Sequence, residues 1–405
     1  MRAPDRRRGL TLIELMVSLA VTAIILAAVM SIVVTITRQR RVSSNIVDTR
    51  VNGRVALSMM QFDAVNAGYR FGTPALAAWV TQNVTTANIT ALGLDNCGMA
   101  AGSGWQVVPG TDVIEFREGA AGRVPGTVLA GMVGCSSPGA CVVPLSSTGG
   151  NPFNSTAEGN DSVVIFSNGT TGCAGRLTTS VGDSGNRPTV ALLAPSLRQN
   201  ATTSTYPGTG VNACPSQFMS VTALASVTRY FVCRPTATTP TLRPALFRQR
   251  LGGTLAVLTP TERVQDGVED VQVAPVLANF MAGASPVGGS GCTGTGAASR
   301  CVCNLTPTTG CTGYDPIPDV LDPNGSAEQR SPMLLRALRV AVTTITTRPR
   351  GTAAEGPPAV RPASFDHAAG AVGHIADQAI VGAENNTRAV VEATFLLQNT
   401  TLVTP

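Results

Sequence analysis

The sequence contains no lysine, two histidines and few aromatic residues. All 29 basic residues are arginine, charged residues make up 13% of the 405-residue chain, and aromatic residues make up 4%. General acid–base and nucleophilic catalysis most often use histidine. His367 and His374 do not have the spacing of an HExxH zinc site. We therefore expect neither an enzyme nor a bound cofactor.

Positive charge is also scarce once the N-terminal segment is set aside. The net charge is +5, and residues 1–9 supply +3 of it through four arginines and Asp5. The remaining chain has 25 arginines against 23 acids. A nearly neutral protein offers little attraction for a phosphate backbone. We therefore expect no nucleic-acid partner.

A long hydrophobic run lies close to the N-terminus. Gly9 ends the arginine-rich segment, and no charged residue occurs from Leu15 to Thr37. Since about 20 apolar residues span a bilayer, residues 10–37 are expected to form a transmembrane helix. Glu14 lies inside this run, where a carboxylate at mid-bilayer depth costs about 2.5–3.5 kcal/mol. The arginines before the run favour a cytoplasmic N-terminus and an exported remainder.

Two simpler interpretations of this segment remain open. A secretory signal peptide has an apolar core of only about 7–15 residues, without an acid inside it. A plain membrane anchor fits the length of the run. It leaves the acid and the junction between Gly9 and Leu10 unexplained.

The helix is expected to continue to about residue 70, for about 55 residues in total. No proline occurs from Arg38 to Tyr69, and Gly53 is the expected place for a bend. The stretch Gly72–Pro74 is expected to end the helix. One face of its second half is predicted to pack on the rest of the chain: Val55, Met59, Phe62 and Tyr69.

Beyond the helix, short apolar runs alternate with turn-rich stretches, which is typical of antiparallel β-structure. The predicted fold class is α+β, with residues 71–405 as a β-rich head carrying long loops and an insertion at about residues 280–315. The clearest predicted strands are residues 112–117, 163–166, 221–232, 255–258, 268–276, 335–347 and 389–397.

Ten cysteines follow the hydrophobic run, and an even number in an exported chain predicts disulfides. Short spacing makes Cys135–Cys141 and Cys214–Cys233 plausible pairs. The last four could pair among themselves: Cys292, Cys301, Cys303 and Cys311. These four lack the paired C-x2-C units of a zinc site, so no metal is expected there.

A weak calcium candidate follows the last cysteines. Asp315, Asp319 and Asp322 could gather carboxylate oxygens, which calcium prefers. Their spacing is not that of an EF-hand, and three prolines interrupt it. A solvated turn is the favoured interpretation.

Five segments carry a resemblance to a known family: Gly9–Leu15, Ala67–Tyr69, Asp266–Val273, Leu335–Val340 and Val391–Asn399. The N-terminus resembles the prepilin signature, and the chain resembles the PilW family of type IV minor pilins. It is more distantly similar to pseudopilin J of type II secretion. Leu10 stands where most family members have phenylalanine, and the insertion at 280–315 also departs from the family.

The resemblance implies a minor pilin that helps to initiate a type IV pilus. A prepilin peptidase would cleave between Gly9 and Leu10 and methylate the new amine of Leu10. Glu14 would then face the terminal amine of a neighbouring subunit. A secretion pseudopilin, a tip adhesin and a DNA-uptake pilin are the alternatives.

The implied partners are other minor pilins, the major pilin, the prepilin peptidase and an inner-membrane assembly platform. The implied location is a single pass through the inner membrane with a periplasmic head, followed by the pilus tip.

Overall fold

The structure is a computed structural model, and its secondary structure confirms a long N-terminal helix followed by antiparallel β-sheet. The described residues are 12–69, 71, 76–81, 84–119, 134–137, 140–142, 161–167, 172–178, 189–193, 220–236, 243–277, 335–345 and 388–397. The chain divides into two compact units, Met1–Asp48 and Thr49–Pro405. The helix α1, Leu12–Asn66, runs through the boundary between these units.

Helix α1 has the expected 55 residues, but it ends at Asn66, before the predicted stop at Gly72–Pro74. Gly68 adopts a φ of 74°, which suits glycine and ends the helical path. Its N–H donates to the carbonyl of Arg117, 2.8 Å away on a neighbouring strand. A backbone contact with the sheet therefore ends the helix before the proline is reached.

The larger sheet has 11 strands among the described residues, and all of its pairs are antiparallel. Its main order is β1-β3-β9-β6-β7-β8-β5-β4; β10 pairs with β9 and β11, and β2 pairs with β9. The strands are β1 Ala78–Thr81, β2 Trp105–Val107, β3 Val113–Gly119, β4 Gly134–Ser137, β5 Ala140–Val142, β6 Val163–Ser167, β7 Gly172–Leu177, β8 Thr189–Leu193, β9 Ser220–Pro235, β10 Ala245–Gly252 and β11 Val257–Asp266.

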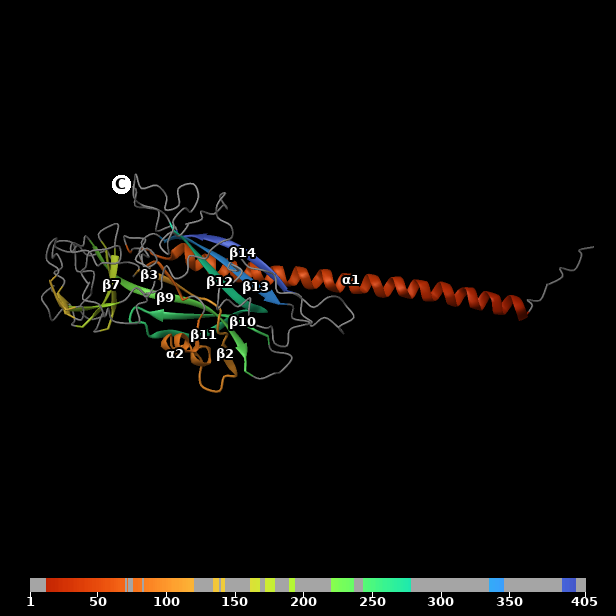
Figure 1. Ribbon diagram of the computed structural model, residues 1–405, viewed down its shortest axis with the longest axis horizontal. Helices are drawn as coiled ribbons and strands as arrows, with labels where there is room; N and C mark the ends of the chain where they lie inside the picture. The colour runs from red at the N-terminus through yellow and green to blue at the C-terminus, as the bar shows by residue number, and fades with distance from the viewer. Residues whose placement is uncertain are drawn as a thin grey trace, which may run out of the picture. The chain divides into compact units, whose positions relative to one another are not determined.

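The smaller sheet has the order β12-β13-β14 (Figure 1). Its strands are β12 Val268–Leu277, β13 Leu335–Ile345 and β14 Arg388–Leu396. Asp112, directly before β3, joins the two sheets, because its N–H donates to the carbonyl of Val271 at 2.9 Å. Its carboxylate Oδ2 accepts from the N–H of Val273 at 2.7 Å. The buried Asp112 therefore satisfies backbone groups on the edge of β12 that faces away from β13.

The second half of α1 packs on both sheets through a buried face in which alanine and glycine alternate with larger apolar residues. Ala56, Met60 and Ala64 are fully buried in the main apolar core. Gly53 allows the closest approach, since a Cβ there would lie 2.8 Å from Cγ2 of Val391 on β14. Gly53 therefore lies inside a continuous helix, where its lack of a side chain lets strand and helix pack closely.

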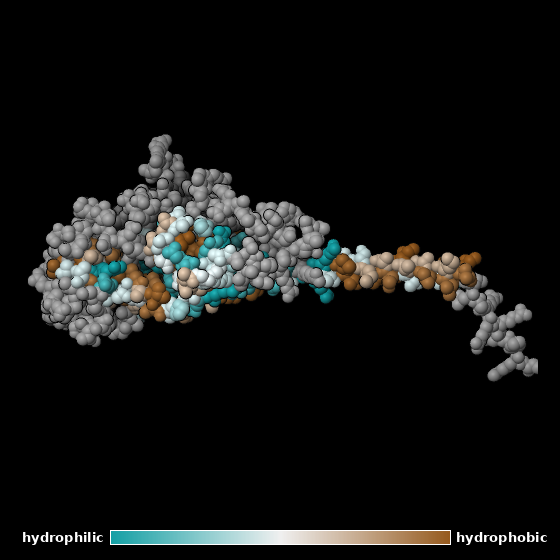
Figure 2. Space-filling view, turned by 90° about the horizontal axis from the view of Figure 1, so that it is seen from below, coloured by the Kyte–Doolittle hydropathy of each residue, from teal (hydrophilic) through white to brown (hydrophobic). Residues whose placement is uncertain are grey.

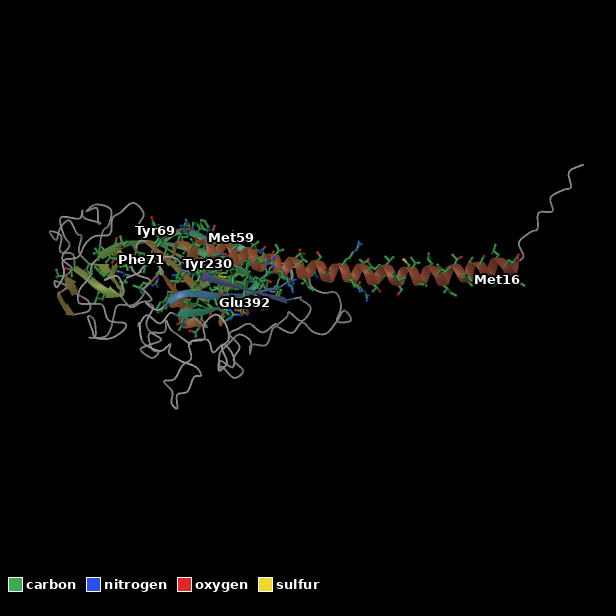
Figure 3. The ribbon with its side chains drawn as sticks, turned by 90° about the horizontal axis from the view of Figure 1, so that it is seen from above. Met16, Met59, Tyr69, Phe71, Tyr230 and Glu392 are labelled. Carbon is green, nitrogen blue, oxygen red and sulfur yellow. A yellow bond between two sulfur atoms is a disulfide. The ribbon has the colours of Figure 1, made fainter. Side chains whose placement is uncertain are left out.

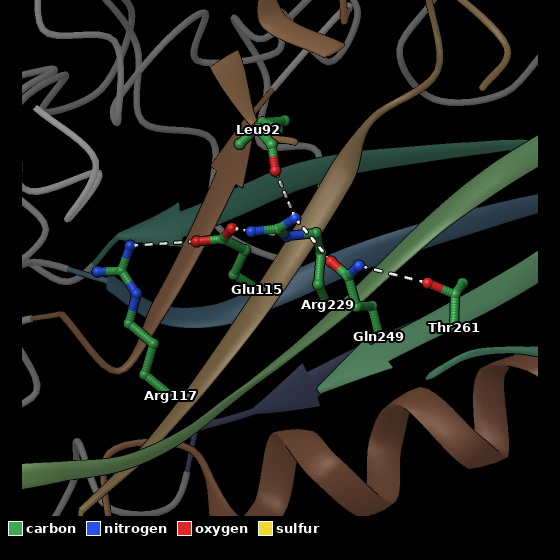
Figure 4. Close-up of polar contacts among 6 residues, drawn as sticks. All are labelled: Leu92, Glu115, Arg117, Arg229, Gln249 and Thr261. Carbon is green, nitrogen blue, oxygen red and sulfur yellow. Dashed lines mark hydrogen bonds and ion pairs between the residues drawn. The ribbon is translucent and has the colours of Figure 1, made fainter. Parts of the chain in front are cut away.

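A buried charged network holds helix α2, Thr86–Ala91, and the 3-10 turn η1, Asp95–Gly98, against the sheet (Figure 4). Arg229 on β9 donates to Glu115 at 2.9 Å, to the carbonyl of Leu92 at 2.9 Å and to Gln249 at 3.0 Å. Arg117 also donates to Glu115, at 3.4 Å. Breaking such a buried pair by removing one partner typically costs about 3–5 kcal/mol.

Candidate functional site

The first half of α1 is exposed and apolar. Among the described residues, α1 is the one helix that is long and apolar enough to cross a membrane, judged by length and composition alone. Its surface is brown in Figure 2 until hydrophilic residues interrupt it. Ser18, Thr22, Thr35 and Thr37 donate their hydroxyls to carbonyls three or four residues earlier. Each of these hydroxyls is therefore satisfied without water.

Glu14 lies in the first turn of α1. The N-terminal end of a helix carries partial positive charge, which favours a carboxylate at this place. Gly9 and Leu10, the other two predicted site residues here, lie outside the described residues. The structure therefore places Glu14 at the start of the apolar helix and leaves the cleavage junction untested.

The predicted packing face of α1 is wrong. Met59 and Tyr69 are about half exposed, and Phe62 is 71% exposed, while Met60 is completely buried. Helix α1 has two apolar faces, and the one with the larger side chains is the one left uncovered. We call the uncovered residues the apolar stripe: Val51, Val55, Met59, Phe62 and Val65.

Polar contacts at the boundary between these two faces hold α1 on the larger sheet. Tyr230 on β9 donates its hydroxyl to Asp63 at 2.6 Å and lies within 3.3 Å of the carbonyl of Met59 (Figure 3). Arg248 on β10 lies 3.7 Å from Asp63 and also pairs with Glu262. Burial and the neighbouring Asp63 carboxylate raise the pKa of Tyr230 well above its usual value. Tyr230 therefore stays a hydrogen-bond donor to the helix at any physiological pH.

Tyr230→Phe should lower the free energy of unfolding by about 1.5–3 kcal/mol, because a hydrogen bond to a charged group is lost. The raised pKa also predicts that the stability of the wild type falls above about pH 10, where the unfolded tyrosine ionises and the folded one does not. Urea unfolding between pH 8 and 11 measures both effects. The variant should lack this part of the alkaline loss, and an equally steep loss in both proteins would contradict the assignment.

One disulfide is present among the described residues, and it corrects a predicted pairing. Cys97 in η1 is bonded to Cys233 in β9, not to Cys214 as predicted. The stretch from Ser220 to Cys233 lies within β9 and spans roughly 43 Å at 3.3 Å per residue. The six residues from Cys214 to Ser220 reach back at most about 20 Å. Short spacing in sequence therefore misled the prediction, because the intervening chain is extended.

Only some of the remaining cysteine and calcium candidates lie among the described residues. Cys135 on β4 lies opposite Cys141 on β5 in the strand register, and their pairing stays a prediction. The described residues contain no group of three or more metal-binding side chains. Outside the described residues lie the insertion and these candidates: Cys214, Cys292, Cys301, Cys303, Cys311, Asp315, Asp319 and Asp322.

The family comparison addresses the N-terminal segment. Residues 4–30 match the family model of the prokaryotic N-terminal methylation motif. This motif includes Gly9, Leu10 and Glu14, and it indicates a type IV pilin-like or pseudopilin-like subunit. It implies a structural subunit that a prepilin peptidase processes and that assembles with other pilus components. No curated protein and no solved structure matches the chain.

Proposed function

We propose that this chain is a minor pilin of the PilW type, a structural subunit of the complex that primes or tips a type IV pilus. The supporting observation is an acid in the first turn of a long exposed apolar helix, inside a methylation motif. The apolar helix fits membrane anchoring, and the disulfide fits an oxidising compartment for the head.

Cleavage after Gly9 has a physical purpose in this proposal. The leader carries Arg2, Arg6, Arg7 and Arg8 on the cytoplasmic side of the apolar helix. Each would cost about 2.5–3.5 kcal/mol at the bilayer centre, so a helix that keeps them resists extraction towards the periplasm. The peptidase removes all four and leaves the methylated amine of Leu10 as the single cationic group at that end.

Glu14 is the assembly residue in this mechanism. In a bundle of apolar helices, a lone carboxylate and a lone ammonium are both poorly solvated. A pair between Glu14 and the Leu10 amine of the neighbouring subunit compensates both charges. Because this pair forms only at one axial offset between two helices, it sets the register of the filament.

The apolar stripe extends the contact surface along the second half of α1. From Val51 to Val65 it covers about 20 Å at 1.5 Å per residue. Helices that are apolar on opposite faces are normally covered on both. The sheets cover one face, so the stripe is the surface that a neighbouring subunit's helix would cover in the assembled filament.

A head of more than 300 residues favours a low-copy subunit over a shaft subunit, since each repeat of a shaft must accommodate the head. Secretion pseudopilins share the methylation motif and are the second candidate. Loss of twitching in a deletion strain, with normal protein secretion, would support a role in a pilus over a role in secretion. Mass spectrometry that finds this chain as the main component of purified filaments would contradict the minor role.

Replacing Val51 and Phe62 with glutamine should reduce the incorporation of this chain into filaments at least tenfold. Glutamine forms helices well, and both side chains are exposed in the subunit. The stability of the isolated subunit should therefore change by less than about 0.5 kcal/mol. Immunoblots of sheared filaments and of membranes measure incorporation and abundance.

Gln61→Ala is the control for the stripe, because Gln61 is exposed on the same helix beside the stripe and is not one of its apolar residues. It should assemble normally. Normal incorporation of the Val51→Gln and Phe62→Gln double variant would show that the stripe is not an assembly surface.

A further inference from the structure

Three arginines follow the uncharged part of α1 at once. Arg38, Arg40 and Arg41 come directly after the charge-free run Leu15–Thr37, and all three are helical. Arg38 and Arg40 are exposed, and neither forms an ion pair among the described residues. We call these three residues the arginine collar.

The collar is a local concentration of positive charge in a chain that is otherwise nearly neutral. After residue 9 the sequence has 25 arginines and 23 acids, and without the collar it has 22 arginines and the same 23 acids. No acid occurs between Glu14 and Asp48. Ion pairs along a helix form between residues three or four apart, so α1 offers the collar no carboxylate of its own.

The position of the collar matches the surface of a bilayer. The 23 residues from Leu15 to Thr37 span about 35 Å as a helix, against about 30 Å for the hydrocarbon core. Arginine side chains at such a boundary extend their guanidinium groups into the head-group layer. The collar therefore lies at the level of lipid phosphates on the exported side.

The three arginines of the collar lie at different positions around the helix, which indicates more than one binding partner. At about 100° per residue, Arg41 lies about 60° and Arg40 about 160° from Arg38. A single neighbouring helix covers one face and cannot meet both sides at once. Lipids surround an anchored helix on every side, and guanidinium binds phosphate oxygens in pairs.

We propose that the arginine collar binds the phosphate groups of anionic phospholipids in the outer leaflet of the inner membrane. This contact holds the anchored subunit at a fixed depth until a filament takes it up. The inference rests on the membrane anchoring in the proposed function and does not depend on the type of filament.

Lipid selectivity of the isolated subunit tests the proposal. The full chain, with Arg2, Arg6, Arg7 and Arg8 changed to glutamine so that the leader does not contribute, is placed in phosphatidylcholine vesicles. Spin-labelled phosphatidylglycerol or phosphatidylcholine then reports which lipid the helix immobilises. An arginine near an anionic surface contributes about a fivefold preference, so phosphatidylglycerol should be favoured severalfold. The preference should fall as salt is raised.

The decisive variant adds Arg38→Gln, Arg40→Gln and Arg41→Gln, and its preference should fall to near one. Arg50→Gln with Arg54→Gln, farther along the same helix, is the control and should keep the preference. An unchanged preference in the collar variant would overturn the proposal, and so would an equal loss in the control. Severalfold selectivity together with normal twitching in the deletion strain would support the lipid site while contradicting the proposed function.

Discussion

Glu14→Ala is expected to leave the protein in the membrane and to abolish its incorporation into filaments. Alanine removes a charge from the apolar helix, so insertion should improve. In the filament the amine of Leu10 on the neighbouring subunit would then lack its partner. Removing one member of a buried ion pair costs about 3–5 kcal/mol, which lowers an association constant by roughly 10²-fold to nearly 10⁴-fold. Immunoblots of membranes and sheared filaments measure the two pools.

Ser18→Ala is the matched control, because Ser18 lies one turn beyond Glu14 and its hydroxyl donates to the carbonyl of Leu15 within the helix. It should assemble normally. N-terminal sequencing of both variants should begin at a methylated Leu10, which separates a defect in assembly from a defect in processing. Filaments that contain normal amounts of the Glu14→Ala protein would refute the pairing mechanism.

The elements that could be predicted from the sequence are those with a single dominant signal. The charge-free run predicted the first half of α1, and short apolar runs between turn-rich stretches predicted β3, β6, β9, β12, β13 and β14. The packing face of α1 could not be predicted this way, because both faces are apolar. The large apolar side chains of Val55 and Phe62 indicated core positions. The buried face instead contains several alanines and Gly53, which allow the helix and the sheets to approach closely.

The buried charged residues are a second feature that could not be predicted from the sequence. Arg117 and Arg229 are fully buried beside Glu115, although arginine is rarely buried. Arg117 pairs with Glu115 two residues earlier on β3, but Arg229 on β9 takes its partners from β3, from β10 and from Leu92 after α2, so no local pattern predicts the whole network. Cys97 and Cys233 are likewise 136 residues apart, and only the fold brings them together.

Replacing both Cys97 and Cys233 with alanine is expected to cause the largest loss of stability in the head. Their bond closes a loop across 136 residues of separation, and chain entropy assigns about 5 kcal/mol to such a loop. It fastens η1 to β9, the strand that pairs with β2, β3, β6 and β10. Because a domain is stable by only about 5–15 kcal/mol, the variant should unfold at much lower urea concentration, or fail to accumulate.

Cys135→Ala with Cys141→Ala is the matched comparison. Their predicted bond would close a hairpin of about seven residues, for which the same chain-entropy relation gives only about 2 kcal/mol. Circular dichroism during urea unfolding ranks the two double variants against the wild type, with and without reducing agent. Reducing agent should bring the wild type close to the Cys97→Ala, Cys233→Ala variant. If that variant unfolds at the wild-type midpoint, the bond between η1 and β9 does not stabilise the head.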